Sequence, residues 1–462
     1  MSRDSKSVRL ISWLDLHYIS LLTVFLLLLY GMQYLANDPS PIRSDGAGYY
    51  AYLPSYVLYA DPSYETDAMI RYGGEFPRWT YVREFPPTGR YLNAYNMGVA
   101  LLILPFFLVA HFLTIWFGFP WAGGWEFMQM RFPLDGYSFF YQHAAGLSGL
   151  FYAVIGFALL KAILKRHFPP GIVMVALTAL LLGTNLLYYS SLFTVNAHPY
   201  TFFLSALLIY LTDRWYREPA RGLWTVGLGL VVGLLYLVRP VNLAMALWIP
   251  LYALCSLGDL AERVRFFWSH RFRILIMLAL AFLCILPQMF IWRYATGSFF
   301  VSSYQHMDAS HFGMPDVLGV LFGIDKGLFI WFPIAVFAFW GFYYLWRLRP
   351  AYFLSSLVVT LVVLLIGGSY LDWRTAGGFG NRYVVDLFAF TAFPMAAFYT
   401  HWQKTWSRVM VGAITVVFIT WNLFLLTLLL RREISLVGLD AQAWFDIFWW
   451  RKSALVEWWQ LR

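Results

Sequence analysis

Long apolar runs recur along the whole chain, and short polar connections separate them. A run of about 20 apolar residues has the length that an α-helix needs to cross the ~30 Å hydrocarbon core of a bilayer. Lipid offers no hydrogen-bond partner to the backbone, so such runs predict helices, which satisfy their own amides. A transmembrane β-barrel would instead show short segments of alternating hydrophobicity. The pattern therefore predicts an all-α, polytopic membrane protein.

The apolar runs predict a bundle of about 12 or 13 transmembrane helices. The runs lie near residues 17–36, 96–118, 137–161, 171–190, 197–212, 222–238, 241–257, 273–292, 327–346, 351–368, 383–400 and 408–430. The whole chain, residues 1–462, then forms a single transmembrane domain with a long connection at 37–95 and a tail at 431–462. The first run is too long for the apolar region of a signal peptide, and further runs follow it.

Clusters of Lys and Arg orient these helices, because cationic residues in short loops favour the cytoplasmic side. Such clusters follow alternate runs, at residues 161–166, 214–221, 263–273, 347–349 and 404–408. Placing them in the cytoplasm puts the 37–95 connection and the 431–462 tail on the extracytoplasmic side.

One part of this topology is inconsistent. Arg3, Lys6 and Arg9 favour a cytoplasmic N-terminus, but the runs 96–118 and 137–161 would then bring the cluster at Lys161 to the outside. A misassigned terminus would explain the conflict, and so would a further crossing within the aromatic stretch 111–136. We expect the further crossing, because it needs only one missed element.

Composition changes this picture little. The chain is 60% hydrophobic and 12% charged, with a net charge of +9. In a soluble protein that charge would suggest nucleic acid, but here most of the Arg lies in the loops that set topology, so we expect no nucleic-acid partner. Cys255 and Cys284 lie within apolar runs, where cysteine behaves as a small hydrophobe, so we expect neither a disulfide nor thiol chemistry.

The 37–95 connection is the longest in the chain and is rich in charges of both signs, which favours a working surface over a tether. Its tyrosines at 49, 52, 56 and 59 fall on one face of a helix. Because tyrosine prefers the headgroup level of a bilayer, we expect a juxtamembrane helix over 48–60 that lies on the outer leaflet and bends at Pro54. Asp45 precedes this helix in an "SDG" turn, so a turn or cap role is the alternative to a functional one.

Several blocks carry a family resemblance. They are Asp45 after the first run and the segments "EFPPTGRYLNAYNMG" (84–98), "VNAHPYTFFLSALLIYL" (195–211), "YLVRPVNL" (236–243), "IDKGLFIWFPI" (324–334) and "DWRTAGGFGNRYVVDLFAFTAFP" (372–394). In this order they resemble the GT-C superfamily of polyprenyl-phosphate-sugar-dependent glycosyltransferases, which includes protein O-mannosyltransferases and lipid A aminoarabinose transferases. Two departures are that Phe85 stands where the mannosyltransferases have His, and that Gly46 follows Asp45 where many members have a second acid.

The resemblance implies an enzyme of the cell inner membrane whose site faces the periplasm. It would transfer a sugar from a polyprenyl-phosphate donor to a lipid, glycan or protein acceptor, without a cofactor. We see no His or carboxylate spacing that commits to a metal, so we expect a metal-independent reaction.

Such a transfer needs a base for the acceptor and positive charge for the departing phosphate. Asp45 is the candidate base and Glu84 the candidate second acid, with a salt bridge as the alternative role of Glu84. The candidates for substrate binding are Arg43, Arg90, His198, Arg239, Lys326, Trp373 and Arg382. Membrane-edge anchoring is the alternative for the cations and for Trp373, and a helix cap is the alternative for His198.

Two other function classes stay open. A lipid or glycan transporter would also place Arg and His at the membrane edge, but the two halves of the chain show no convincing repeat and the charged candidates gather on one side. An O-antigen ligase or polymerase would use similar donors, although its large outer loop usually comes late in the chain. The sequence assigns neither the sugar, the acceptor nor the oligomeric state.

Overall fold

The computed structural model describes residues 2–35, 40–77, 80, 82–118, 133–256, 258–303, 312–402 and 404–449, without the side chains of 2–8 and 448–449. The chain is 74% helical and has almost no strands, so the prediction of an all-α membrane protein is confirmed. Seven helices in the described part are long and apolar enough to cross a membrane. These are α1 (Ser2–Tyr34), α4 (Gly98–Gly118), α6 (Phe139–Leu164), α12 (Arg271–Thr296), α17 (Pro350–Ser369), η6 (Arg382–Leu387) continued by α18 (Phe388–His401), and α19 (Thr405–Leu430).

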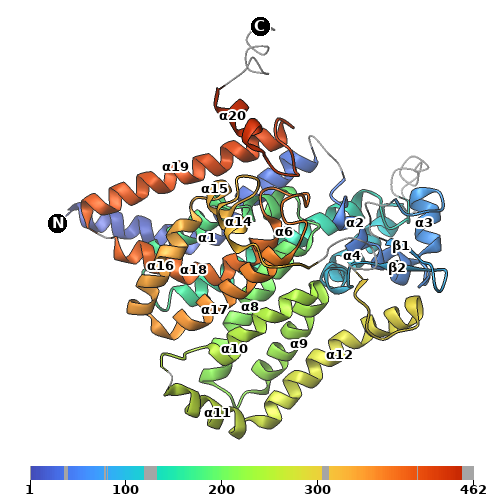
Figure 1. Ribbon diagram of the computed structural model, residues 1–462, viewed down its shortest axis with the longest axis horizontal. Coiled ribbons are helices and arrows are strands. Elements are labelled where there is room, and N and C mark those ends of the chain that lie inside the picture. The colour runs from blue at the N-terminus through green and yellow to red at the C-terminus, as the bar shows by residue number, and fades with distance from the viewer. Residues whose placement is uncertain are drawn as a thin grey trace.

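Shorter or more polar helices complete the bundle (Figure 1). They are α7 (Pro170–Gly183), η4 (Tyr188–Leu192), α8 (Ala197–Arg217), α9 (Gly222–Val238), η5 (Pro240–Leu247), α10 (Trp248–Leu251), α11 (Asp259–Ser269) and α16 (Ala335–Leu348). The 40–95 connection forms a cap at one end of the bundle. It contains α2 (Asp45–Tyr50), η1 (Leu53–Leu58), α3 (Glu65–Tyr72) and an antiparallel hairpin of β1 (Val82–Phe85) and β2 (Arg90–Asn93). The short helices α14 (Val317–Phe322), α15 (Leu328–Trp331) and α20 (Ala441–Trp449) complete the described part.

The contacts between α1 and α6 bear on the inconsistency in the predicted topology. Helices α1 and α6 are antiparallel, because Lys161 pairs with Asp15 at 3.1 Å at one end and Tyr30 contacts His143 at 3.1 Å toward the other. The N-terminal end of α1 and the Lys161 cluster therefore lie at the same end of the bundle, opposite the cap, as their charges require.

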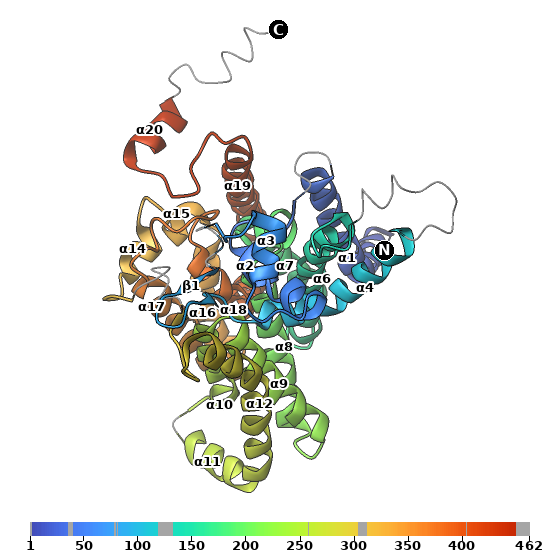
Figure 2. The ribbon, with the colours of Figure 1, turned by 90° about the vertical axis from the view of Figure 1, so that its right-hand side faces the viewer.

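Helix α4 runs antiparallel to the first half of α6. Its C-terminal part stacks on the start of α6 through Phe117 and Phe140, and Leu102 accepts a hydrogen bond from Tyr152 at 3.1 Å. Its first residue, Gly98, lies against Val238, where α9 ends. Figure 2, which looks onto the cap, shows this helix lengthwise. The crossing expected within 111–136 falls on a stretch of which residues 119–132 lie outside the described part, so it stays a prediction.

The helix expected over 48–60 forms as α2 and η1, with Pro54 in the first turn of η1. The expected headgroup position of its tyrosines is wrong. Tyr50 and Tyr52 are 0% and 3% exposed, and their hydroxyls donate to the carbonyls of Gly136 and Tyr95, both at 2.6 Å. Protein carbonyls satisfy these phenols in place of the wet headgroup layer, so the aromatic face packs inward.

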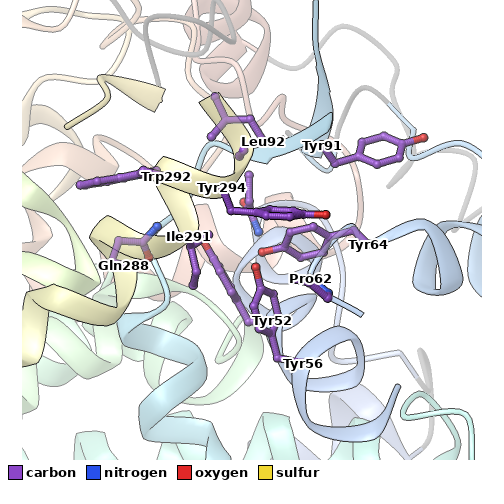
Figure 3. A pocket seen from close by; sticks show the side chains of 12 residues that line it. Tyr52, Tyr56, Pro62, Tyr64, Tyr91, Leu92, Gln288, Ile291, Trp292 and Tyr294 are labelled. Carbon is purple, nitrogen blue, oxygen red and sulfur yellow. The ribbon is translucent and has the colours of Figure 1, made fainter. Parts of the chain in front are cut away.

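Figure 3 shows this packing between the cap and the end of α12. Tyr52, Tyr56 and Tyr64 gather with Tyr294, and the Tyr56 and Tyr64 rings meet edge to face at 5.6 Å. The space between them has no room for a water molecule. The tyrosine cluster therefore fixes the cap rigidly on the bundle.

The C-terminal tail also packs on protein. The tail forms the helix α20 up to Trp449, and residues 450–462 lie outside the described part. Trp444 of α20 donates from its indole nitrogen to the Ile324 carbonyl at 2.8 Å and stacks on Trp421 of α19. These contacts hold the tail beside the loops at the cap end.

Candidate functional site

A cavity of about 1120 Å³ lies at the cap end, between the ends of α1 and α19, the start of α2, and the loop before η6. It has five charged lining residues, which are Arg43, Asp45, Asp372, Arg382 and Arg432. The backbone of 375–378 and of 434–437 forms much of the remaining wall. Segments from the beginning, the last quarter and the end of the chain thus meet around one polar space.

Asp45 and Arg382 form an ion pair within this cavity. Arg382 Nη1 lies 2.7 Å from Asp45 Oδ2, and the two side chains are 20% and 13% exposed. Asp45 begins α2 directly after Ser44, whose φ of 49° turns the chain back toward the bundle. Arg382 begins η6 after Asn381, whose side chain caps the helix by accepting from the Tyr383 amide at 3.0 Å. The structure therefore brings together two of the residues predicted from sequence, although 337 positions separate them.

The residue after Asp45 has no room for a side chain. A Cβ added to Gly46 would lie 2.3 Å from the carbonyl oxygen of Val195. The absence of a second adjacent acid therefore has a steric reason, since α2 begins in direct backbone contact with the loop before α8.

Three guanidinium groups give the cavity its positive character. Arg43, predicted from sequence, packs over the rings of Tyr34 and Phe193 at 5.6 Å and reaches toward the Leu192 carbonyl. Arg432 follows the last transmembrane helix and lines the opposite wall. Sequence reasoning missed Arg432 because it lies in a run of charges, RRE, that resembles an ordinary helix end.

Asp372 is a second carboxylate in the cavity that sequence reasoning missed. The Tyr383 hydroxyl donates to its Oδ2 at 2.9 Å, while its Oδ1 is buried without a partner among the described residues. The signal was present in the block that begins with this residue, "DWRTAGGFGNR", but a carboxylate before a tryptophan also suits a membrane-edge turn.

Two predicted ligands, His198 and Arg239, do not line the cavity and instead contact a shared carboxylate, Asp386. Asp386 contacts His198 Nδ1 at 3.1 Å through Oδ1 and Arg239 Nη1 at 3.3 Å through Oδ2. All three side chains are almost fully buried. Arg239 lines only a smaller cavity of about 150 Å³ together with Ser302. Sequence reasoning found the two partners, His198 and Arg239, but missed the carboxylate, which stands in η6 directly before an apolar helix.

Lys326 supports the cavity wall from behind. It is 0% exposed, and its ammonium group donates to the carbonyls of Ala376 and Leu436, the latter at 2.6 Å. Burial and the positive charge of Arg382 lower the pKa of Lys326 to about 7, against the opposing effect of Asp372. The two carbonyls belong to residues that line the cavity, whereas Lys326 does not line it.

The remaining predicted residues lie outside the cavity. Trp373 is buried at 4% exposure, with the Arg374 guanidinium 5.0 Å from its ring. Glu84 is exposed in the hairpin, opposite Tyr91. Arg90 donates to the Tyr294 carbonyl at 2.7 Å, which fastens the hairpin to α12.

In the described part of the chain no group of three His, Cys, Asp or Glu side chains is arranged to hold a metal ion. Comparisons of the chain with protein-family models, with curated proteins and with solved structures find no match.

Proposed function

We propose that this multi-pass membrane protein is a glycosyltransferase of the GT-C type. It would take a sugar from a polyprenyl-phosphate donor and transfer it to a lipid, glycan or protein acceptor on the extracytoplasmic side of the cell inner membrane. One observation carries the proposal: the Asp45 carboxylate and the guanidinium groups of Arg43, Arg382 and Arg432 line one cavity. A ligand pocket commonly has a volume of roughly 300–1000 Å³, so this cavity has room for a sugar phosphate and an acceptor group.

Asp45 and the guanidinium groups have different roles in the proposed reaction. Asp45 accepts the proton of the acceptor hydroxyl or amine, whose oxygen or nitrogen then bonds to the anomeric carbon of the sugar. The bond between that carbon and the donor phosphate oxygen breaks, and the polyprenyl phosphate leaves with the electron pair. Guanidinium groups stabilise the charge that develops on this phosphate, because their planar fork can hold two phosphate oxygens.

The ion pair between Asp45 and Arg382 connects donor binding to this chemistry. A phosphate that enters the cavity competes with Asp45 for the Arg382 guanidinium, because both are anionic acceptors of the same N–H groups. Donor binding would then release the carboxylate that the reaction requires.

A lipid-phosphate transporter is the second candidate, and a specific observation favours it. A second, apolar cavity of about 980 Å³ is lined by α1, α7 and α19, with Ile11, Phe25 and Thr415 among its lining residues. Helices α1 and α19 also line the polar cavity. A headgroup site at one end and a lipid groove along the same helices would suit translocation of a whole lipid.

Reconstitution separates the two candidates. The purified chain in lipid vesicles receives a polyprenyl-phosphate sugar with a labelled sugar, together with a membrane extract as the acceptor source. A transferase converts the donor to polyprenyl phosphate and labelled product, and the Asp45→Asn variant does not. Movement of intact donor between leaflets without conversion would refute the transferase proposal and support a transporter.

A further inference from the structure

After α19 the chain turns back over the cavity. The Arg432 amide donates to the Leu429 carbonyl and the Glu433 amide to the Leu428 carbonyl, both at 2.9 Å. This turn places Arg432 at a φ of 61° and directs the following residues across the cap end. We call residues 432–439 the strap, because most of them line the cavity.

The strap is fastened to two loops of the bundle. The Leu436 carbonyl accepts from the Gly378 amide at 3.2 Å and from Lys326 Nζ at 2.6 Å. Further along, the Leu439 amide donates to the Asp325 carbonyl at 3.3 Å. Ile434 and Leu439 are buried at 7% and 3% exposure, so the strap is packed as well as hydrogen-bonded.

Lys326 is the side chain that joins the strap to the facing cavity wall. Its amino group contacts Leu436 in the strap and Ala376 in the loop before Arg382. A fully buried lysine is costly unless its donors are satisfied, and here two backbone carbonyls satisfy them. An amine that loses its extra proton still keeps two N–H donors, so this bridge holds in both protonation states.

We propose that Arg432 is a further ligand of the donor phosphate and that Lys326 is the positioning residue that holds the strap so that Arg432 faces the cavity. This inference rests on the proposed function, because it names a residue of the same donor site. It also changes the role expected of Lys326, from a phosphate ligand to a support of the wall that presents one.

The neighbouring residue, Arg431, is a matched control for Arg432. Arg431 pairs with Glu433 at 3.1 Å, its side chain is 46% exposed, and it does not line the cavity. Substitution of either arginine by glutamine removes one positive charge from the same turn. Only the Arg432 substitution removes charge from the cavity.

The test measures binding of a sugar-free polyprenyl monophosphate to the full chain in nanodiscs, with the uncharged polyprenol as reference probe. We expect Arg432→Gln to weaken binding roughly 10-fold or more, as expected for loss of a charge-assisted hydrogen bond, and Arg431→Gln to leave it unchanged. Equal binding by wild type and Arg432→Gln would overturn the inference alone. A wild type that binds the phosphate no better than the polyprenol would overturn the proposed function as well.

The positioning role has its own readout. Lys326→Met keeps the volume of the buried side chain but removes its donors. We expect it to raise the donor KM without lowering kcat at saturating donor, and to speed hydrogen exchange at the Gly378 and Leu439 amides. In the double variant with Arg432→Gln we expect no loss of binding beyond that of Arg432→Gln alone, because both act through one guanidinium.

Losses that add in the double variant, or unchanged exchange in Lys326→Met, would refute the positioning role. If Lys326→Met does not fold, Lys326→Gln serves as the second variant, because its amide keeps N–H donors on a shorter side chain. The Arg432 arm does not depend on either, since Arg432 is an exposed residue whose replacement leaves the packed part of the strap intact.

Discussion

Replacement of Asp386 by Asn would remove the negative charge that two buried side chains, those of His198 and Arg239, contact. Arg239 and Asp386 side chains are 10% and 4% exposed, and the nearest atoms of the pair are 3.3 Å apart. At an effective dielectric constant of about 20, two unit charges at that distance attract by ~5 kcal/mol. Measured losses for one partner of a buried pair are about 3–5 kcal/mol, because the other charge stays buried and unpaired. We expect Asp386→Asn to lower the unfolding free energy by about that amount.

The assay is equilibrium unfolding in mixed detergent micelles, followed by tryptophan fluorescence at one protein concentration. The double variant Asp386→Asn with Arg239→Met removes both charges, so we expect it to recover a large part of the lost stability. A matched surface pair is Arg221 and Glu218, whose side chains are 66% and 39% exposed, and Glu218→Gln should cost less than about 1 kcal/mol. If Asp386→Asn costs no more than Glu218→Gln, the Asp386 cluster is solvated and the reasoning fails.

Three further predictions concern the cavity. Asp45→Asn should abolish sugar transfer while polyprenyl-phosphate binding persists, and a variant with normal turnover would remove Asp45 as the base. Gly46→Ala should destabilise the chain by several kcal/mol in the same unfolding assay, because its Cβ would meet the Val195 carbonyl at 2.3 Å, and a neutral effect would contradict that contact. Lys326, with a pKa of about 7 in place of 10.5, should make the strap more stable as pH rises from 7 towards 10.5, since the open strap binds the extra proton there. Exchange protection at Leu439, corrected for intrinsic rates, should grow by at most about 1.4 kcal/mol per pH unit in wild type and stay flat in Lys326→Met.

The length of the apolar runs predicted the helical membrane fold, because a helix that spans the bilayer needs about 20 apolar residues and satisfies its own backbone. Helix α4 shows what the length of an apolar run does not predict. Its composition is that of a spanning helix, but its partners, Phe140 and Tyr152, set it along only the first half of α6. Depth in the membrane is set by such tertiary contacts, which a single hydropathy profile does not contain.

The residues of the candidate site were also predicted only in part. Sequence reasoning found Asp45 through its place in the family resemblance, and Arg43 and Arg382 as cations on the extracytoplasmic side of the predicted topology. It missed Asp372 and Arg432, which stand in polar loops where a charge costs little and is a weak signal. It also could not tell that Lys326 faces two carbonyls, because that direction depends on residues 50 and 110 positions away.

Three parts of the chain that are distant in sequence meet at the cavity. Asp45 comes from the cap, Arg382 begins a transmembrane helix, and Arg432 belongs to the strap that follows the last one. The lining holds three guanidinium groups, those of Arg43, Arg382 and Arg432, and two carboxylates, those of Asp45 and Asp372, so it carries surplus positive charge. Such a surplus favours an anionic ligand, and a phosphate that takes over Arg382 would both bind and free Asp45 in one step. Under the proposed function, donor recognition and activation of the base would then be one exchange, in which Arg382 changes its partner from Asp45 to the phosphate.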